Sequence, residues 1–105
     1  MNQKRPVRIV AFGDSITAAT HQELRDRWPE ILRHALVERF PACAIEMTNA
    51  GVGGNTSREG LRRFKQDVLP HKPHFVSVEF GNDMTPDRDR HVSLQEFVAN
   101  LDAII

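Results

Sequence analysis

Ser15 is the first residue of the chain whose type and place could do covalent chemistry. It follows the apolar run Val7 to Phe12 and the pair Gly13-Asp14. A turn at the end of a buried strand can expose a serine hydroxyl, which attacks a carbonyl carbon once a base removes its proton. The tripeptide alone leaves a second interpretation equally open, in which Asp14 or Ser15 caps the next helix.

Three glycines form a second candidate segment for the same chemistry. Gly51, Gly53 and Gly54 let the backbone approach a ligand closely, and an N–H group there can donate to an oxyanion. A turn that needs positive φ angles would also use glycines. A phosphate-binding loop is disfavoured, because the Walker A lysine is absent and Thr56 stands where the dinucleotide fingerprint needs its third glycine.

Asn82 follows a third apolar stretch and supplies a side-chain amide. An amide at a strand end is a good oxyanion donor, because it is neutral and fixed in direction. The alternative is an Asx turn, which asparagine makes commonly. Asn82 therefore joins Ser15 and Gly54 as a candidate site residue.

Hydrophobic periodicity predicts the elements that would position these segments. The predicted strands cover residues 7–12, 44–48 and 74–80. The predicted helices cover residues 28–40, 56–69 and 93–105, with Pro29 in the first turn of the first helix. This alternation is typical of an α/β layered fold with parallel strands and right-handed crossovers. The loops at 13–17, 49–56 and 81–85 would then converge at the carboxyl edge of the sheet, where such folds build their sites.

Two helix starts carry the S/T-x-x-E spacing of a capping box. The first pairs Thr56 with Glu59, and the second pairs Ser93 with Glu96. Residues 18–27 show no clean apolar stripe, so the pattern leaves their structure open.

Composition limits the classes of partner. The chain has 105 residues, which allows one small domain, and its 14 basic residues balance 14 acidic ones. This balance gives no net field to recruit nucleic acid or an anionic membrane. We interpret the local cluster of Arg58, Arg62, Arg63 and Lys65 as a solvated helix face. Cys43 is interpreted as a buried structural thiol. The apolar run near the start is too short for a signal peptide, which favours a cytoplasmic protein.

Together the three segments resemble, in order and spacing, the first three sequence blocks of the SGNH (GDSL) hydrolases. The matching stretches are Phe12-Gly13-Asp14-Ser15-Ile16-Thr17, Asn49 to Thr56, and Gly81-Asn82-Asp83. The resemblance implies a flavodoxin-like three-layer α/β/α fold and hydrolysis of acyl, acetyl, lipid or thioester substrates. It also implies that Ser15 is the nucleophile, and that the N–H groups of Ser15 and Gly54 with the Asn82 side chain form the oxyanion hole. A small-molecule ester is the expected partner, and no cofactor or metal is expected.

The sequence departs from the family pattern at two places. Gly81 is followed directly by Asn82, where the third block usually has one residue between them. The fourth block, Asp-x-x-His, which supplies the base and its orienting acid, occurs nowhere in the chain. We therefore expect the 105-residue chain by itself to be essentially inactive. Only two of its five histidines could lie near the carboxyl-edge loops, namely His21 and His91; the others are His34, His71 and His74.

Two other functions stay open from the sequence alone. One is a non-catalytic module that binds an acyl or glycan group, and the other is a nucleotide- or phosphate-binding α/β domain. The apolar ending Leu101-Asp102-Ala103-Ile104-Ile105 and the small number of strands predict that residues 1–105 form a single domain that is incomplete at the C-terminus. An unprotected sheet edge would also favour self-association.

Overall fold

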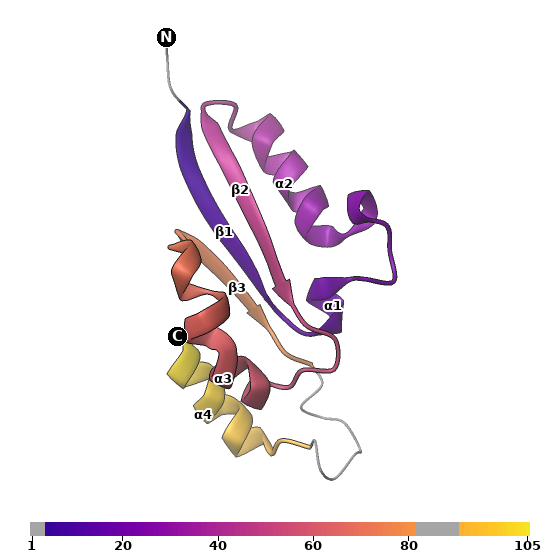
Figure 1. Cartoon of the computed structure of the whole chain (residues 1–105), viewed down its shortest axis with the longest axis vertical. Helices are drawn as coiled ribbons and strands as arrows, with labels where there is room; N and C mark the ends of the chain where they lie inside the picture. Colours follow the sequence, from indigo (N-terminus) through magenta and orange to yellow (C-terminus); the bar gives the residue numbers. More distant parts are fainter. Residues whose placement is uncertain (1–3, 82–90) are drawn as a thin grey trace.

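A parallel sheet forms the centre of the protein (Figure 1). The computed structural model describes residues 4–81 and 91–105. Within them the strands are β1 (Arg5–Gly13), β2 (Cys43–Gly51) and β3 (Phe75–Glu79), in the spatial order β2-β1-β3. Both neighbours run parallel to β1, so the carboxyl ends of the strands share one edge. The predicted parallel α/β sheet is confirmed.

The central strand β1 is the most deeply buried, because its apolar run is covered on both faces. Val10 and Phe12 have no exposed surface, and Ala11 is 1% exposed. The second strand is longer than predicted: it continues through Asn49 to Gly51, which pairs with Gly13. The expectation that the loop starts at residue 49 was therefore wrong. Pairing along the whole of β1 outweighs the turn preference of asparagine and glycine there.

Helices follow the strands in the predicted order. They are α1 (Ser15–Ala18), α2 (Trp28–Arg39), α3 (Ser57–Asp67) and α4 (Leu94–Ile104), with short 3-10 turns η1 (Leu24–Asp26) and η2 (Leu69–His71). Pro29 lies in the first turn of α2, as predicted. Pro70 lies inside η2 rather than at the end of α3. No helix in the described part of the chain is both long and apolar enough to cross a membrane.

The helices cover opposite faces of the sheet, which gives the three-layer α/β/α arrangement (Figure 1). Helix α2 lies on one face, and α3 and α4 lie together on the other. The core on the α3 side contains Val10, Phe12, Val68, Phe80 and Ile104. Within it, the Phe12 ring meets the Phe80 ring edge-on, with 5.3 Å between centroids.

Caps fix where α3 and α4 begin. Thr56 and Glu59 form the predicted capping box, with the Thr56 N–H donating to Glu59 Oε2 at 2.8 Å. Ser93 caps α4 by accepting from the Glu96 N–H at 3.1 Å. The carboxylate of Glu96 does not complete the second box, because it pairs with Arg58 on α3 at 2.7 Å. That pair instead joins the two helices.

Candidate functional site

Ser15 lies in a sharp turn between β1 and α1. Asp14 is the N-cap of α1, and its Oδ1 accepts from the Ile16 N–H at 3.0 Å. Asp14 is 1% exposed, whereas Ser15 is exposed to solvent. The capping interpretation is therefore confirmed for Asp14, and Ser15, the next residue, has its side chain exposed; its role as a nucleophile stays a prediction. The serine hydroxyl sits at the carboxyl edge of the sheet.

The short helix α1 is held against the end of β2. Asn49 Nδ2 donates to the Thr17 carbonyl at 2.9 Å, and Asn49 Oδ1 accepts from the Gly51 N–H at 2.9 Å. Gly51 packs so closely that a Cβ there would lie 2.3 Å from the Ala18 nitrogen. A four-residue helix is too short to be stable alone, so these contacts keep Ser15 in place.

The glycine segment passes beside Ser15. The chain leaves β2 at Gly51, and the Val52 N–H donates to the Gly13 carbonyl at 3.0 Å. A Cβ placed on Gly53 would lie 4.0 Å from the Cβ of Ser15. Gly54 has φ 79°, a backbone conformation that glycine adopts at no steric cost. The structure therefore brings two of the predicted segments together, and it assigns Gly51 to close packing and Gly54 to a positive φ.

The third predicted segment meets the serine turn at its first residue. The Gly81 N–H donates to Asp14 Oδ2 at 2.8 Å, so Asp14 links the serine turn to the end of β3. Asn82 lies outside the described residues, and its placement stays a prediction.

A second carboxyl group, which the sequence analysis did not single out, lies behind the serine turn. Glu79 ends β3, and its Oε1 accepts from the Thr17 hydroxyl at 3.1 Å. Burial raises the pKa of Glu79 above its ordinary value, and the neighbouring Asp14 carboxylate raises it further. A charged pair at this spot would repel, so the site favours a protonated Glu79. The only signal in the sequence was an acidic residue at the end of a mostly apolar strand.

Arg63 corrects the interpretation of the basic cluster as a solvated face. Its side chain is 14% exposed, and its Nη2 donates to the Gly13 carbonyl at 2.8 Å. Its Nε donates to Asn55 Oδ1 at 2.7 Å, and its guanidinium carbon lies 4.4 Å from the centre of the Phe12 ring. The prediction was wrong for Arg63 because this side chain points to the sheet edge. The exposed side chain of Arg62 agrees with the prediction.

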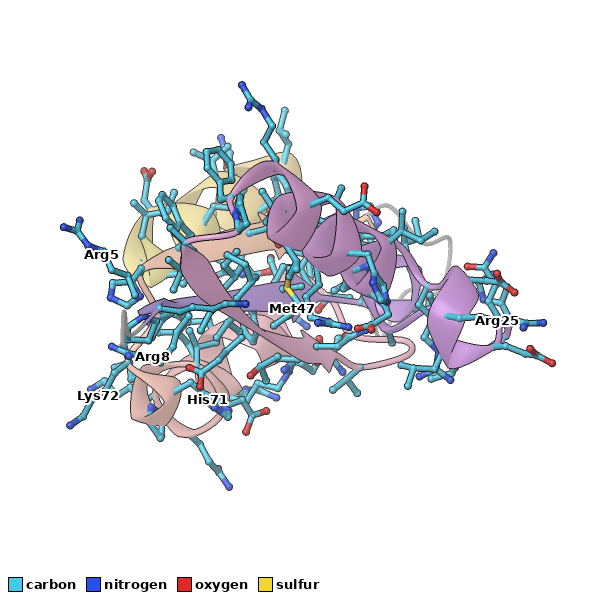
Figure 2. The ribbon with its side chains drawn as sticks, turned by 90° about the horizontal axis from the view of Figure 1, so that it is seen from above. Arg5, Arg8, Arg25, Met47, His71 and Lys72 are labelled. Atoms are coloured by element: carbon cyan, nitrogen blue, oxygen red, sulfur yellow. The ribbon has the colours of Figure 1, made fainter. Side chains whose placement is uncertain are left out.

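Three of the described histidines lie away from the serine turn. His74 Nδ1 accepts from the Arg8 N–H at 2.9 Å at the amino end of the sheet, and His34 contacts Glu30 on α2. Figure 2 shows His71 toward the end of the molecule that carries Arg8. His21 and His91 are exposed.

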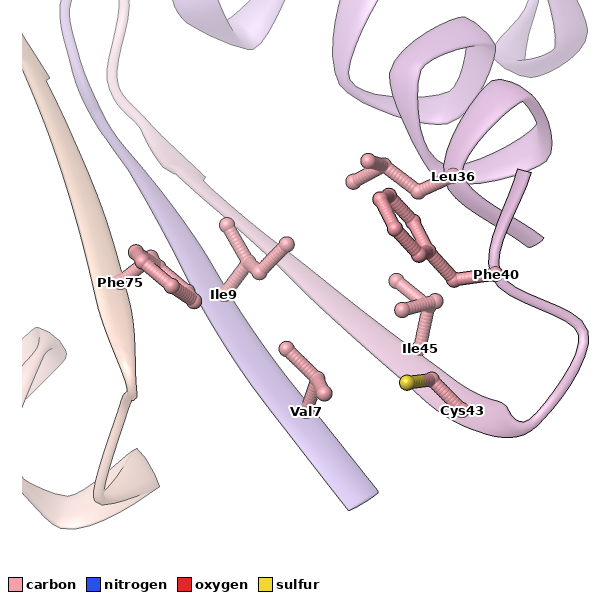
Figure 3. A pocket seen from close by; sticks show the side chains of 7 residues that line it. All are labelled: Val7, Ile9, Leu36, Phe40, Cys43, Ile45 and Phe75. Carbon is pink, nitrogen blue, oxygen red and sulfur yellow. The ribbon is translucent and has the colours of Figure 1, made fainter. Parts of the chain in front are cut away.

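An apolar pocket lies on the sheet face next to α2 (Figure 3). It has a volume of about 370 Å³, and its lining is Val7, Ile9, Leu36, Phe40, Cys43, Ile45 and Phe75. The half-buried Cys43 points into this apolar surface, which partly agrees with the prediction of a buried structural thiol. The strand residues of the lining lie toward the amino ends, so the pocket is separate from the serine turn.

Across residues 4–81 and 91–105, no group of three or more potential ligands is placed to hold a metal ion.

The fold and the site define an α/β/α protein with a serine exposed at the carboxyl edge of a parallel sheet. The profile of the GDSL-like lipase/acylhydrolase family matches residues 11–105. The chain belongs to this family, as its resemblance to the SGNH (GDSL) hydrolases predicted.

Individual relatives agree with this assignment. An uncharacterized lipoprotein of Bacillus subtilis (strain 168), YqeF, is 39% identical over 102 residues, which cover 89% of this chain and 40% of that protein. The crystal structure of AlinE4, an SGNH-hydrolase family esterase, superposes with a TM-score of 0.76 at 36% identity and covers 99% of this chain and 52% of its own. An acetyl xylan esterase from Geobacillus stearothermophilus has a TM-score of 0.82 at 27% identity, covering 99% of this chain and 55% of its own. The chain thus spans about half the length of these relatives.

Proposed function

We propose that the protein is an ester hydrolase in which Ser15 attacks the carbonyl carbon of a small acyl or acetyl ester. The observation that carries the proposal is the exposed Ser15 side chain, held by the buried Asp14 cap beside the Gly53–Gly54 backbone. The relatives include an acetyl xylan esterase and an SGNH-hydrolase family esterase, which supports this substrate class.

The proposed reaction has two halves. The Ser15 Oγ–H bond breaks, a bond forms from Oγ to the carbonyl carbon, and the alcohol leaves with the proton. Water then cleaves the acyl-enzyme, releasing the acid and restoring the hydroxyl. The N–H groups of Ser15 and Gly54 and the Asn82 side chain would stabilise the oxyanion. One such donor contributes a factor of about 10²–10³ to the rate in a model protease.

The serine needs a base, and we propose that the 105-residue chain by itself supplies none. The Asp-x-x-His block is absent from the sequence, and His34 and His74 make their contacts away from Ser15. Without a base, positioning and oxyanion stabilisation remain. In a model protease these leave roughly 10³–10⁴-fold catalysis over water. The intact triad adds a factor of about 10⁶ to this in that protease, so we expect turnover of the isolated chain to be very low and independent of Ser15.

Chemical rescue with imidazole tests both parts of the proposal. p-Nitrophenyl acetate hydrolysis is measured for the chain, for Ser15→Ala and for the control Ser77→Ala, which removes an exposed hydroxyl from β3. Each protein is assayed with and without added imidazole. Because imidazole hydrolyses the ester by itself, Ser15→Ala at the same concentration is the baseline.

The expected result is no difference between the three proteins without imidazole. With imidazole, the chain and Ser77→Ala should both exceed Ser15→Ala, and mass spectrometry should find the acetyl group on Ser15. Robust turnover without imidazole that depends on Ser15 would refute the missing base. Equal rates in all conditions, with no acetylated Ser15, would refute the proposed nucleophile.

A further inference from the structure

Arg63 connects the ends of two strands and the glycine loop. Its guanidinium donates to the Gly13 carbonyl at the end of β1 and to the Ala50 carbonyl in β2, both at 2.8 Å. Its Nε donates to Asn55 Oδ1 at 2.7 Å, directly after Gly54. One side chain on α3 therefore contacts the segment before Ser15 and the segment after Gly54.

The guanidinium is fixed from its other sides as well. The side chain is 14% exposed, and Asp67 lies one helical turn away at 3.2 Å. The guanidinium carbon lies over the Phe12 ring, 4.4 Å from its centre, and that ring has no exposed surface. A largely buried cation is costly unless it is paired, and here carbonyls, an amide oxygen, a carboxylate and a ring surround it. Arg63 consequently has little freedom to move independently of the core.

We propose that Arg63 is a positioning residue, whose guanidinium holds the Ser15 turn and the Gly53–Gly54 loop at a fixed separation and so sets the geometry of the oxyanion site. This inference rests on the proposed function for its catalytic consequence. Arginine suits this role because its five N–H donors form a rigid planar fork. The single ammonium of lysine cannot reach acceptors on three segments in one plane, so Arg63→Lys keeps the charge and loses the geometry.

The catalytic effect follows from the small separation across the site. The position of a Cβ on Gly53 is 4.0 Å from the Ser15 Cβ, so a displaced loop changes the distance between the two oxyanion donors directly. A misplacement of about 1 Å can cost roughly 100-fold in rate. The loss should appear in the rate constant for acylation and leave the half-saturating ester concentration unchanged, because the ester contacts neither Arg63 nor Asn55 in this scheme.

Two readouts test the proposal on the full chain. The first is amide hydrogen exchange at Val52 and Asn55, whose N–H groups donate to the Gly13 and Val52 carbonyls on either side of Gly53–Gly54, with Val10 in the core as the reference for global opening. The second is the Ser15-dependent acylation rate in imidazole. The variants are Arg63→Lys, Asn55→Ala and Asn55→Asp, and the control is Arg62→Met on the exposed side of α3. Asn55→Ala removes one acceptor and keeps the arginine in place, so it tests the contact even if Arg63→Lys folds poorly.

We expect Arg63→Lys and Asn55→Ala to speed exchange of the hydrogen-bonded amides at positions 52 and 55 by at least about tenfold relative to Val10. Asn55→Asp, which keeps the oxygen acceptor, should restore slow exchange, and Arg62→Met should match the wild type. Acylation should slow by about 10- to 100-fold in the first two variants alone. Unchanged local exchange in both variants would overturn the proposal. If Ser15→Ala matches the wild type in rate, the proposed function fails, and the exchange results decide alone whether Arg63 holds the loop.

Discussion

Replacing Gly51 with alanine tests the close approach between β2 and the serine helix. A Cβ at this position would lie 2.3 Å from the Ala18 nitrogen, 2.7 Å from the Ala18 Cα and 2.9 Å from the Asp14 carbonyl oxygen. All three atoms belong to the backbone, so no side chain can rotate away to make room. Gly51→Ala must displace α1 from the edge of the sheet, and Ser15 moves with it.

Gly53→Ala is the matched control, because the same methyl group there meets only the Ser15 Cβ, at 4.0 Å. Neither glycine has a positive φ, in contrast to Gly54. Both substitutions lower the entropy of the unfolded chain equally, which favours folding by about 0.4–1 kcal/mol. Overpacking costs about 1–3 kcal/mol. The common gain cancels, so Gly51→Ala should be less stable than Gly53→Ala by about 1–3 kcal/mol.

Urea unfolding followed by far-ultraviolet circular dichroism measures this difference at one pH and one protein concentration. In a domain of this size, each kcal/mol also lowers the melting temperature by about 4–8 °C, which gives an independent check. If both variants unfold at the same urea concentration with the same slope, the close packing of Gly51 against α1 is wrong. The explanation of how Ser15 is held would then fail with it.

Three further changes test the surroundings of the site. Glu79→Gln should flatten the dependence of the unfolding free energy on pH. The pKa of Glu79 is raised in the folded state, so this residue stabilises the fold fully below the ordinary pKa of 4.5. That stabilisation is lost as the pH rises through the raised pKa. Parallel pH profiles of unfolding free energy for the wild type and Glu79→Gln would contradict this. Phe12→Ala should lower the unfolding free energy by about 3–5 kcal/mol, because it leaves a cavity between the Phe64 and Phe80 rings. The control Phe75→Ala, at a site that is 66% exposed, should cost far less in the same urea titration. Thr56→Ala should cost about 1 kcal/mol through loss of the α3 cap, with the exposed Thr20→Ala as a neutral control, and equal melting temperatures would count against the capping role.

Much of the fold was predictable because its signals are local. The apolar run before Gly13 predicts a buried strand, the helical spacing from Trp28 predicts α2, and Thr56 with Glu59 predicts where α3 begins. The length of β2 was not predictable from its own residues. Its last turn-forming residues, Asn49 to Gly51, stay in the strand because β1 offers partners up to Gly13. A neighbouring strand is not visible in a local pattern.

The sequence by itself determined the family and the place of Ser15, because short motifs and strand ends depend on residues that are close along the chain. Only the tertiary structure decided what holds that serine. Arg63 reaches Gly13 across 50 positions, Asn49 reaches Thr17 across 32, and Gly81 reaches Asp14 across 67. These contacts arise from the parallel order β2-β1-β3, which brings the carboxyl ends of distant strands to one edge. An exposed arginine and a largely buried arginine that joins several segments have the same sequence pattern, and only the packing distinguishes them.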